Sequence, residues 1–288
     1  MAHHPLDPDG DAGGADLERR FGGVRRLHGP QAPALLAAAS VAVVGLGGVG
    51  SWTAEALARC GVGALTLIDL DHIAESNVNR QVHALSGTLG QAKVEAMADR
   101  IRAIHPGCRL TLVDDFLTPD NVAALLAPGL HAVADCTDQV RAKLAMILHA
   151  RGAGLPLVVC GGAGGKTDPL ALRAGDLSEA RNDALLAKIR HELRRRHGYP
   201  GGGAGGKAAR LPRMKVRTLW VDQPARLPGQ WLDARAGAEA PQGLSCAGYG
   251  SIVTVTAAMG LAAAHEALAA VLDDAGRKSS RRKHSAPL

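Results

Sequence analysis

The sequence predicts an α/β protein with a doubly wound, mostly parallel Rossmann-like sheet, helices on both faces of that sheet, and a less regular C-terminal part. Three observations favour this fold. A glycine-rich turn joins a short apolar run to a helix-like run, an acidic residue ends the next apolar run, and strand and helix patterns alternate up to about residue 160. Strands that alternate with helices typically form a parallel sheet.

The stretch from Ser40 to Gln81 carries the first two observations. Its parts are the apolar run 41–44, the turn Gly45-Leu46-Gly47-Gly48-Val49-Gly50, the helix-like run 52–57, the apolar run 64–68 and Asp69. This order is typical of a mononucleotide-binding βαβ unit. Glycines let a phosphate approach the backbone, and the helix presents free N–H groups to the anion. The alternative is a glycine turn that only allows helix and strand to pack.

A dense set of polar side chains follows Asp69. It consists of Ser76, Asn77, Asn79, Arg80 and Gln81. Lys93 then lies in the first turn of a helix predicted over residues 91–104. Cations are disfavoured at a helix N-terminus, so a bound anion would explain this lysine. An ordinary exposed lysine is the alternative.

The alternation of strand and helix patterns continues beyond that helix. The sequence predicts a strand at 110–113, a helix at 118–126 capped by Thr118, a strand at 132–135, a helix at 140–151 and a strand at 155–159. Asp135 and Asp138, in the motif DCTD, lie at the carboxyl end of a strand, where α/β sheets bind ligands. The loop Gly161–Gly165 either shapes the floor of the pocket or binds a monovalent cation through its carbonyl groups. A simple wide turn is the alternative.

Beyond that loop the pattern is less regular. A basic helix is predicted over 177–197, a strand over 216–221, a strand or the start of a helix over 251–257, and a helix over 259–272. Residues 17–272 are expected to form one domain, with a nucleotide unit over about 40–165 and a substrate-binding basic region over about 166–250. Residues 1–16, the glycine run 201–206 and the basic tail 273–288 are expected to be disordered.

The composition excludes several classes of protein. With 47% hydrophobic residues in 288, the chain can bury a substantial core. Its five cysteines form no CxxC pair, which argues against a cysteine-rich zinc site and a disulfide framework and favours the reducing cytoplasm. The uncharged stretch 244–264 is long enough to cross a membrane, but its Gly, Ala, Ser and Thr residues favour a buried core segment. No membrane association is expected.

The net charge of +6 permits a polyanionic partner. Basic residues concentrate between Lys188 and Arg217, where ten Lys/Arg residues accompany a single acid, Glu192. Such a stretch fits a nucleic-acid substrate, with a solvated basic helix as the alternative.

Together, GLGGVG, SNVNRQ, Lys93 and DCTD resemble the ubiquitin-activating-enzyme-like adenylyltransferases over roughly residues 18–165. The resemblance implies ATP and Mg²⁺ as cofactors. It assigns Gly45, Gly47, Gly48 and Gly50 to the phosphate turn, Asp69 to the ribose, Ser76, Asn77, Arg80 and Lys93 to the phosphates, and Asp138 to Mg²⁺. Because charge develops at the α-phosphate during carboxylate attack, Arg80, Lys93 and Asp138 are the predicted catalytic residues. No protein nucleophile is needed.

The resemblance also implies a homodimer in which an arginine near the N-terminus of one subunit reaches the ATP of the other. Arg20 and Arg25 are the candidates, because Gly22 and Gly23 stand where a further arginine is often found.

Within the family, the two zinc-binding CxxC pairs of the sulfur-carrier enzymes are absent. RFGGVRRLHG, DDFLTPDN, GGAGGKTDP and SCAGYGS instead resemble the branch of tRNA threonylcarbamoyladenosine dehydratases. This implies a ligase-type enzyme that uses ATP to activate the threonylcarbamoyl carboxylate next to the tRNA anticodon and closes it into a ring with loss of water. One alternative is adenylation of the C-terminal carboxylate of a small sulfur-carrier protein. Another is a non-catalytic ATP-binding scaffold in sulfur transfer.

Cys246, in SCAGYGS, is a candidate catalytic thiol because some relatives use a cysteine covalently. Relatives in this branch also work beside a cysteine-desulfurase and sulfur-acceptor system, which is therefore a possible partner. Ring closure needs no thiol, so a packed or substrate-lining Cys246 is the alternative. Cys136, in DCTD, is expected to be structural.

Overall fold

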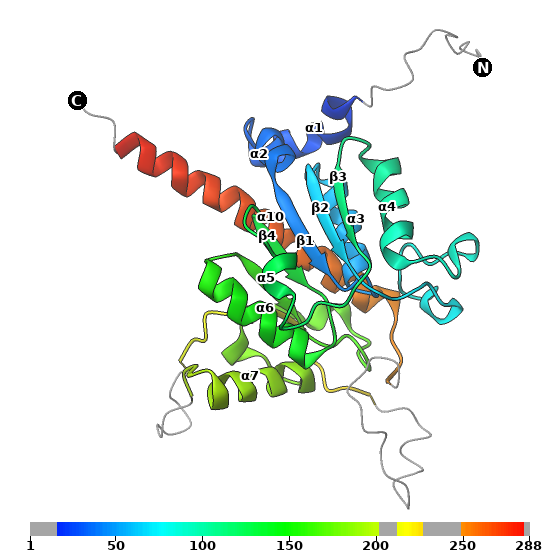
Figure 1. The fold of residues 1–288 in the computed structure, drawn as a ribbon, viewed down its shortest axis with the longest axis vertical. Helices are drawn as coiled ribbons and strands as arrows, with labels where there is room; N and C mark the ends of the chain where they lie inside the picture. The colour runs from blue at the N-terminus through cyan, green and yellow to red at the C-terminus, as the bar shows by residue number, and fades with distance from the viewer. Residues whose placement is uncertain (1–15, 202–211, 227–248, 285–288) are drawn as a thin grey trace, which may run out of the picture.

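A computed structural model of the chain describes residues 16–201, 212–226 and 249–284, with side chains up to residue 273 (Figure 1). Seven strands form one sheet in the order β3-β2-β1-β4-β5-β7-β6. They are β1 (Ser40–Val44), β2 (Ala64–Ile68), β3 (Arg109–Val113), β4 (Ala132–Asp135), β5 (Leu157–Cys160), β6 (Leu172–Asp176) and β7 (Arg217–Val221). Every neighbouring pair is parallel except β6 and β7. The predicted doubly wound, mostly parallel sheet is therefore confirmed.

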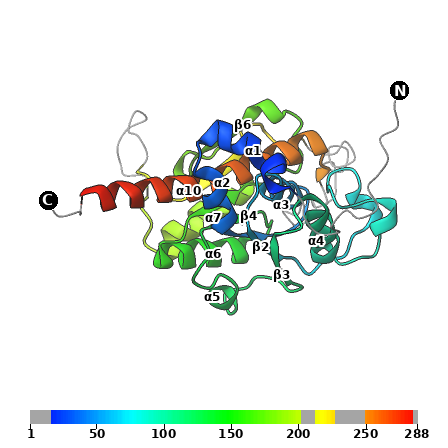
Figure 2. The ribbon, with the colours of Figure 1, turned by 90° about the horizontal axis from the view of Figure 1, so that it is seen from above.

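Helices cover both faces of this sheet, as Figure 2 shows. The helices are α1 (Leu17–His28), α2 (Ala32–Ala38), α3 (Gly50–Arg59), α4 (Lys93–Ile104), α5 (Val122–Leu125), α6 (Val140–Ala153), α7 (Ala184–Arg196) and α10 (Val253–His284). Side chains of α3, α4 and α10 share one hydrophobic cluster with β1 and β2. Those of α5, α6 and α7 pack on the opposite face.

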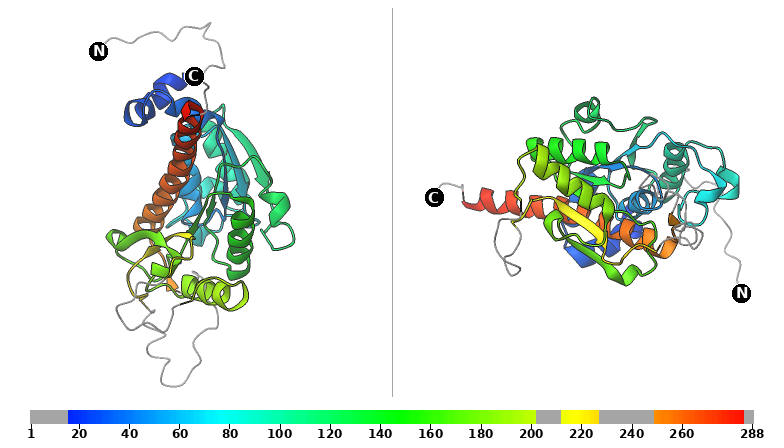
Figure 3. Two further views of the ribbon diagram at one scale, coloured as in Figure 1. Left: turned by 90° about the vertical axis from the view of Figure 1, so that its left-hand side faces the viewer. Right: turned by 90° about the horizontal axis from the view of Figure 1, so that it is seen from below.

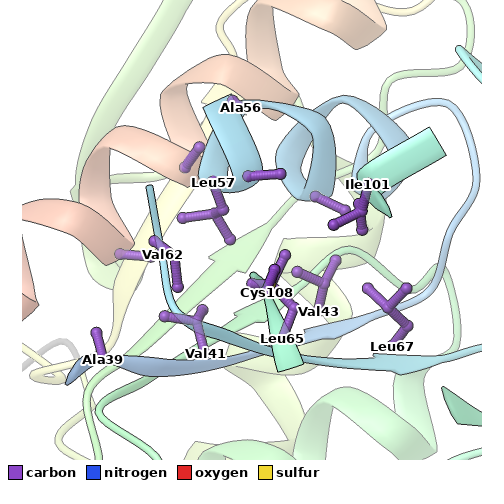
Figure 4. Packing of buried hydrophobic residues seen from close by; sticks show 14 of the residues in the cluster. Ala39, Val41, Val43, Ala56, Leu57, Val62, Leu65, Leu67, Ile101 and Cys108 are labelled. Carbon is purple, nitrogen blue, oxygen red and sulfur yellow. The ribbon is translucent and has the colours of Figure 1, made fainter. Parts of the chain in front are cut away.

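The alternation of side chains along the strands explains why both faces are apolar. Val41 and Val43 belong to the cluster under α3, whereas Ala42 and Val44 pack with α5 and α6. Figure 4 shows Val41 and Val43 beside Leu57 of α3. A strand covered on both faces reads as a continuous apolar run, which is what the sequence shows at residues 41–44.

The long helix α10 lies along the face that α3 also covers and packs against α3, β4, β5 and β7 (Figure 3). Gly260 permits this contact, since a β-carbon there would lie 2.4 Å from the carbonyl oxygen of Val49. Within the described residues, the segment Val253–Asp273 is long and apolar enough to cross a membrane, and 44% of its most apolar window is buried in the protein. Its buried residues, among them Val255, Met259 and Ala263, belong to a hydrophobic cluster of the core, which favours the core segment predicted for residues 244–264.

The segment 118–126 differs from its prediction as one helix capped by Thr118. The structure contains only α5 there, and the preceding residues form a turn. The side chain of Asn121 accepts the N–H of Thr118 at 2.7 Å. That hydrogen bond uses the chain before α5 for a turn, so Thr118 is not the helix cap.

The basic segment predicted as one helix over 177–197 is also divided. A short 3-10 turn, Leu177–Glu179, precedes α7, and the Asp183 side chain caps α7 by accepting the N–H of Leu186. The sequence analysis did not predict β6, because LRAGD is short and only Leu172 and Ala174 in it are apolar. β6 joins the sheet beside β7, which agrees with the strand predicted at 216–221. The C-terminal part therefore extends the same sheet.

The last helix is longer than predicted at both ends. α10 begins at Val253, so the segment 251–257 starts a helix, and it continues to His284 through most of the predicted disordered tail 273–288. Extending an existing helix is favourable where no proline intervenes, and the first proline lies at Pro287. The predicted disorder of residues 1–15 and 202–206 lies outside the described residues.

Candidate nucleotide site

A cavity of about 410 Å³ opens at the carboxyl ends of the central strands. Its wall is formed by residues that follow β1, β2, β4 and β5. The chain leaves β1 and β4 in opposite directions across the sheet, and doubly wound folds bind ligands at such a switch point.

The glycine turn forms one wall of the cavity. Gly45, Gly47 and Gly48 line it. Gly45 has a φ of 85°, in the left-handed region that favours glycine. Gly50 plays a different part, because a β-carbon there would lie 1.8 Å from the carbonyl oxygen of Gly45. Gly50 thus allows the turn to close, while the other three glycines face the ligand space.

Asp69 ties this turn to the end of β2. Its carboxylate accepts the N–H of Leu46 at 2.6 Å and the N–H of Asp71 at 2.9 Å. Burial raises the pKa of Asp69, and the nearby Lys93 ammonium opposes that rise. The carboxylate remains on the cavity wall, where the predicted ribose contact requires it.

Lys93 lies buried at the start of α4 and lines the cavity. Its ammonium is 2.6 Å from the Asp71 carboxylate and 3.8 Å from that of Asp69. These two carboxylates explain a lysine at a helix N-terminus before any anion binds. Sequence reasoning missed Asp71, although an acid three residues beyond the end of β2 was the available signal.

The SNVNRQ loop brings Asn77 and Arg80 to the cavity, whereas Ser76 is exposed and does not line it. The Arg80 guanidinium donates to the Ser76 carbonyl at 2.6 Å, so Ser76 contributes its backbone. The indole N–H of Trp52 donates to the Arg80 carbonyl at 3.0 Å. Trp52 on α3 therefore holds the loop in place, a role hidden in sequence because a tryptophan on a helix normally indicates packing.

The two aspartates of DCTD have different environments. Asp138 is exposed and lines the cavity. Asp135 is fully buried, 3.0 Å from the ammonium of the fully buried Lys143, and it accepts both the N–H and the hydroxyl of Thr137. The prediction that Asp135 faces a ligand is therefore wrong. Burial raises the pKa of Asp135, and the Lys143 ammonium opposes the rise.

The glycine loop after β5 is held from two sides. A β-carbon on Gly161 would lie 2.1 Å from the Asp183 carboxylate, which accepts the N–H of Gly162 at 2.8 Å. Lys166 donates to the carbonyls of Asn182 and Gln223. The loop does line the floor of the cavity. The monovalent cation near Gly161–Gly165 stays a prediction.

The donor set suits Mg²⁺ bound together with a nucleotide. Among the residues that the structure describes, no group of three or more His, Cys, Asp or Glu side chains could hold a metal alone. Mg²⁺ usually takes one or two carboxylates and fills its remaining positions with water and phosphate oxygens. Asp69 and Asp71 are already bonded to backbone N–H groups or Lys93, whereas Asp138 is exposed to the cavity.

Comparison with known proteins agrees with this geometry. The profile of the ThiF family matches residues 24–286. The chain belongs to the ThiF family. It is 44% identical to the tRNA threonylcarbamoyladenosine dehydratase of Escherichia coli over 90% of this chain and 96% of that protein.

A solved structure of that dehydratase and one further relative show how much of the chain each similarity covers. A crystal structure of the E. coli dehydratase in complex with ATP has a TM-score of 0.79 and 41% identity, and the match covers 91% of this chain and 98% of that one. The molybdopterin-synthase adenylyltransferase of Salmonella typhimurium is 40% identical over 42% of this chain and 48% of its own length. The similarity to the dehydratase thus extends over the C-terminal part as well.

Three residues that the sequence analysis proposed for the site lie away from the cavity or outside the described residues. Arg20 donates to the carbonyl of Ile104, at the far end of α4 from Lys93, and Arg25 pairs with Glu18 at 2.7 Å. Both arginines therefore lie at the amino end of the sheet, opposite their own chain's cavity. Cys246 falls among the residues that the structure does not describe.

His83 is a buried polar residue next to the SNVNRQ loop that sequence reasoning missed. Its side chain is 1% exposed, and neither ring nitrogen has a hydrogen-bond partner within the described chain. Burial, followed by the charges of Lys93 and Arg100, lowers the pKa of His83 from 6.5 to about 4.

Acidification from pH 6.5 to about 4 is expected to destabilise the fold through His83. Over that range the unfolded chain takes up a proton that the folded chain excludes, so the free energy of unfolding falls by up to roughly 3 kcal/mol. Urea unfolding at a series of pH values measures this change in the free energy of unfolding. His83→Phe should lose this part of the pH dependence, whereas His191→Phe, at an exposed position of α7, should retain it. Equal pH slopes in wild type and His83→Phe would contradict the assignment.

Proposed function

We propose that the protein binds ATP with Mg²⁺ in this cavity and uses it to dehydrate N6-threonylcarbamoyladenosine next to the anticodon of tRNA. The observation that carries the proposal is the convergence of Arg80, Lys93 and Asp138 on one cavity beside a glycine turn. Similarity over nearly the whole length to a dehydratase named for this reaction supports the choice of substrate.

The chemistry follows from the positions of these groups. The threonyl carboxylate attacks the α-phosphate of ATP, and pyrophosphate leaves. During this attack, Lys93 and Arg80 offset the negative charge that grows on the phosphates. Asp138 would hold Mg²⁺, which neutralises the pyrophosphate oxygens. A nitrogen or oxygen of the same nucleoside next attacks the mixed anhydride and expels AMP, so the ring closes with the net loss of one water. No thiol takes part in these steps.

The exposed face of α7 is the proposed tRNA-binding surface. Lys188, His191 and Arg195 lie exposed along one side of this helix, and Arg181 is exposed just before it. The N-terminus of α7 is joined to the cavity, because Asp183 accepts the N–H of Gly162. A basic row thus leads away from the site of chemistry, as the backbone of a bound tRNA requires.

Replacing Lys188 and Arg195 together with alanine is expected to weaken tRNA binding and reduce its salt dependence. Each lost phosphate contact lowers the slope of log K against log salt by about one. Filter binding at several salt concentrations measures both the affinity for tRNA and this slope. Arg109→Ala, at an exposed position of β3 at the opposite edge of the sheet, serves as the matched control. Unchanged affinity and slope in the double variant would remove α7 from the binding surface.

We further propose a homodimer in which Arg20 or Arg25 contacts the ATP of the partner subunit. Both arginines lie opposite their own cavity, so any contact with ATP requires a second copy.

Mixing two inactive variants tests this arrangement. A dimer of Arg20→Ala with Asp138→Ala should regain activity that neither variant has alone, because one of its two sites then keeps both groups. Arg25→Ala is tested in the same way. If neither mixture regains activity although sedimentation shows mixed dimers, the arginines do not act across subunits.

Mass spectrometry of nucleosides tests the reaction itself. Modified tRNA is incubated with the protein, ATP and Mg²⁺ and then digested to nucleosides. The threonylcarbamoyladenosine peak should lose the mass of one water only when ATP is present. Intact nucleoside with normal ATP binding would contradict the dehydratase assignment.

In that case the sequence similarity to molybdopterin-synthase adenylyltransferase over the nucleotide half favours adenylation of a small sulfur-carrier protein. Pyrophosphate exchange in the presence of a carrier with a Gly-Gly tail would detect that activity. A scaffold would bind ATP without either reaction. A cytoplasmic location and a cysteine-desulfurase partner accompany the dehydratase proposal.

A further inference from the structure

Two cysteines stand side by side at the nucleotide cavity. Cys160 ends β5, and Cys136 directly follows β4. The parallel register of these strands pairs Asp135 with Val159, so the next residues along, Cys136 and Cys160, face one another. Cys160 belongs to the hydrophobic cluster under α10, and Cys136 packs against that same cluster. Both side chains therefore point to the same face of the sheet.

The Cys160 thiol also lies close enough to Cys136 for that side chain to shift its pKa. A hydrogen bond to Cys136, followed by burial, raises the pKa of the Cys160 thiol well above its usual value. Neighbouring strands lie about 4.8 Å apart. That spacing is within the range of roughly 4.4 to 6.8 Å between the α-carbons of disulfide-bonded cysteines. A bond between these sulfurs is therefore geometrically accessible across the two strands.

The surroundings of the two thiols decide the order of reaction. Cys136 is half-buried and lines the cavity, so a small oxidant reaches it. Cys160 is 1% exposed and lies behind it. The cavity-facing cysteine is thus placed to be oxidised first and the buried one to resolve it, an arrangement found in redox-sensitive proteins of reducing compartments.

We propose that Cys136 and Cys160 form a reversible disulfide under peroxide and that this modification blocks the nucleotide cavity. The Cys136 sulfur attacks hydrogen peroxide and the O–O bond breaks; the hydroxide that leaves takes up the proton of the Cys136 thiol, which gives a sulfenic acid and one water. The sulfur of Cys160 then attacks the Cys136 sulfur, its proton leaves with the hydroxyl as a second water, and the S–S bond forms. Two thiols lose two electrons and two protons, and one peroxide becomes two waters.

The disulfide affects nucleotide binding because the residues that directly follow Cys136 form part of the cavity wall. Thr137 and Asp138 follow it on the cavity wall, and a β-carbon on Gly45 would already lie 3.1 Å from the Cys136 carbonyl carbon. Drawing Cys136 toward β5 shifts a segment that the glycine turn packs against closely. The inference rests on the proposed ATP site and is independent of the tRNA reaction.

Peroxide treatment of the full chain, followed by alkylation of free thiols and peptide mass spectrometry, tests the bond. The expected product is a linked peptide containing Cys136 and Cys160, lighter by two hydrogens. Binding of a fluorescent ATP analogue should be lost in step with the link and recovered with dithiothreitol. Saturating ATP should slow the linking, because bound nucleotide covers Cys136.

Variants separate this pair from the other thiols. Cys160→Ala should yield no linked peptide and leave Cys136 as a sulfenic acid that dimedone traps, while Cys108→Ala and Cys60→Ser, which do not line the cavity, should behave as wild type. The proposal is overturned if Cys136 oxidises without linking to Cys160, if it links to another cysteine, or if the linked protein binds the analogue as tightly as the reduced one. Failure of reduced protein to bind the analogue would instead count against the proposed function, since the linked peptide is detected without it.

Discussion

Asp138→Asn is expected to reduce the turnover of threonylcarbamoyladenosine by about 10²–10³-fold with almost no change in stability. Asp138 is exposed on the cavity wall. Its amide replacement keeps the shape but removes the charge proposed to hold Mg²⁺, so the phosphates lose a counter-charge during attack. Surface substitutions of this kind usually change the free energy of unfolding by less than about 0.5 kcal/mol. Single-turnover kinetics and urea unfolding measure the two effects separately.

Asp120→Asn provides the control for that substitution. Asp120 is also exposed, and it precedes α5 without lining the cavity. Its replacement should leave both turnover and stability unchanged. Raising the Mg²⁺ concentration should partly rescue Asp138→Asn and have no effect on Asp120→Asn. Normal turnover in Asp138→Asn would exclude the carboxylate from metal binding.

Lys143→Met is expected to have the largest effect on stability, lowering the free energy of unfolding by about 3–5 kcal/mol. Lys143 and Asp135 are both fully buried and 3.0 Å apart. Removing the ammonium leaves an uncompensated carboxylate in the core, and one of its oxygens, Oδ2, already has no hydrogen-bond partner among the described residues. Urea unfolding with a wild-type m-value measures the loss.

The double variant Asp135→Asn with Lys143→Met distinguishes a lost charge pair from a packing defect. Asparagine keeps an acceptor for the hydroxyl and N–H of Thr137 but carries no charge. The double variant should therefore be more stable than Lys143→Met alone. Lys188→Met, at an exposed position of α7, should cost little. A double variant no more stable than the single one would show that lost packing, and not lost charge, dominates.

The buried pair of Lys143 and Asp135 also holds two loops that line the cavity. Lys143 donates to the carbonyl of Cys160 at 2.7 Å, and Asp135 anchors Thr137. One buried ammonium thus joins the loops that follow β4 and β5, which carry Asp138 and the glycine floor. A substitution that leaves the chain folded but moves these two loops relative to each other should raise the KM for ATP more than it lowers kcat.

Much of the fold was readable from local sequence. The apolar run before the glycine turn, the acid at the end of β2 and the alternation of strands with helices all depend on neighbouring residues. Strand β6 escaped prediction because LRAGD lies at a sheet edge and carries little apolar pattern. The sequence predicted helices at α7 and α10 but not their bounds. The start of α7 depends on the capping carboxylate of Asp183, and α10 extends beyond the predicted helix at both ends.

The sequence by itself indicated the glycine turn and the predicted ribose acid Asp69, because they lie next to two apolar runs, whereas Arg80, Lys93 and Asp138 were predicted from the resemblance of SNVNRQ and DCTD to a known family. Only the tertiary structure decided that Asp135 is an internal counter-ion, that Asp71 holds Lys93 and that Trp52 holds Arg80. Those partners come from different strands and helices. The burial of a charge, or the carbonyl that an indole reaches, is set by how these elements pack, which the spacing of residues along one segment does not record.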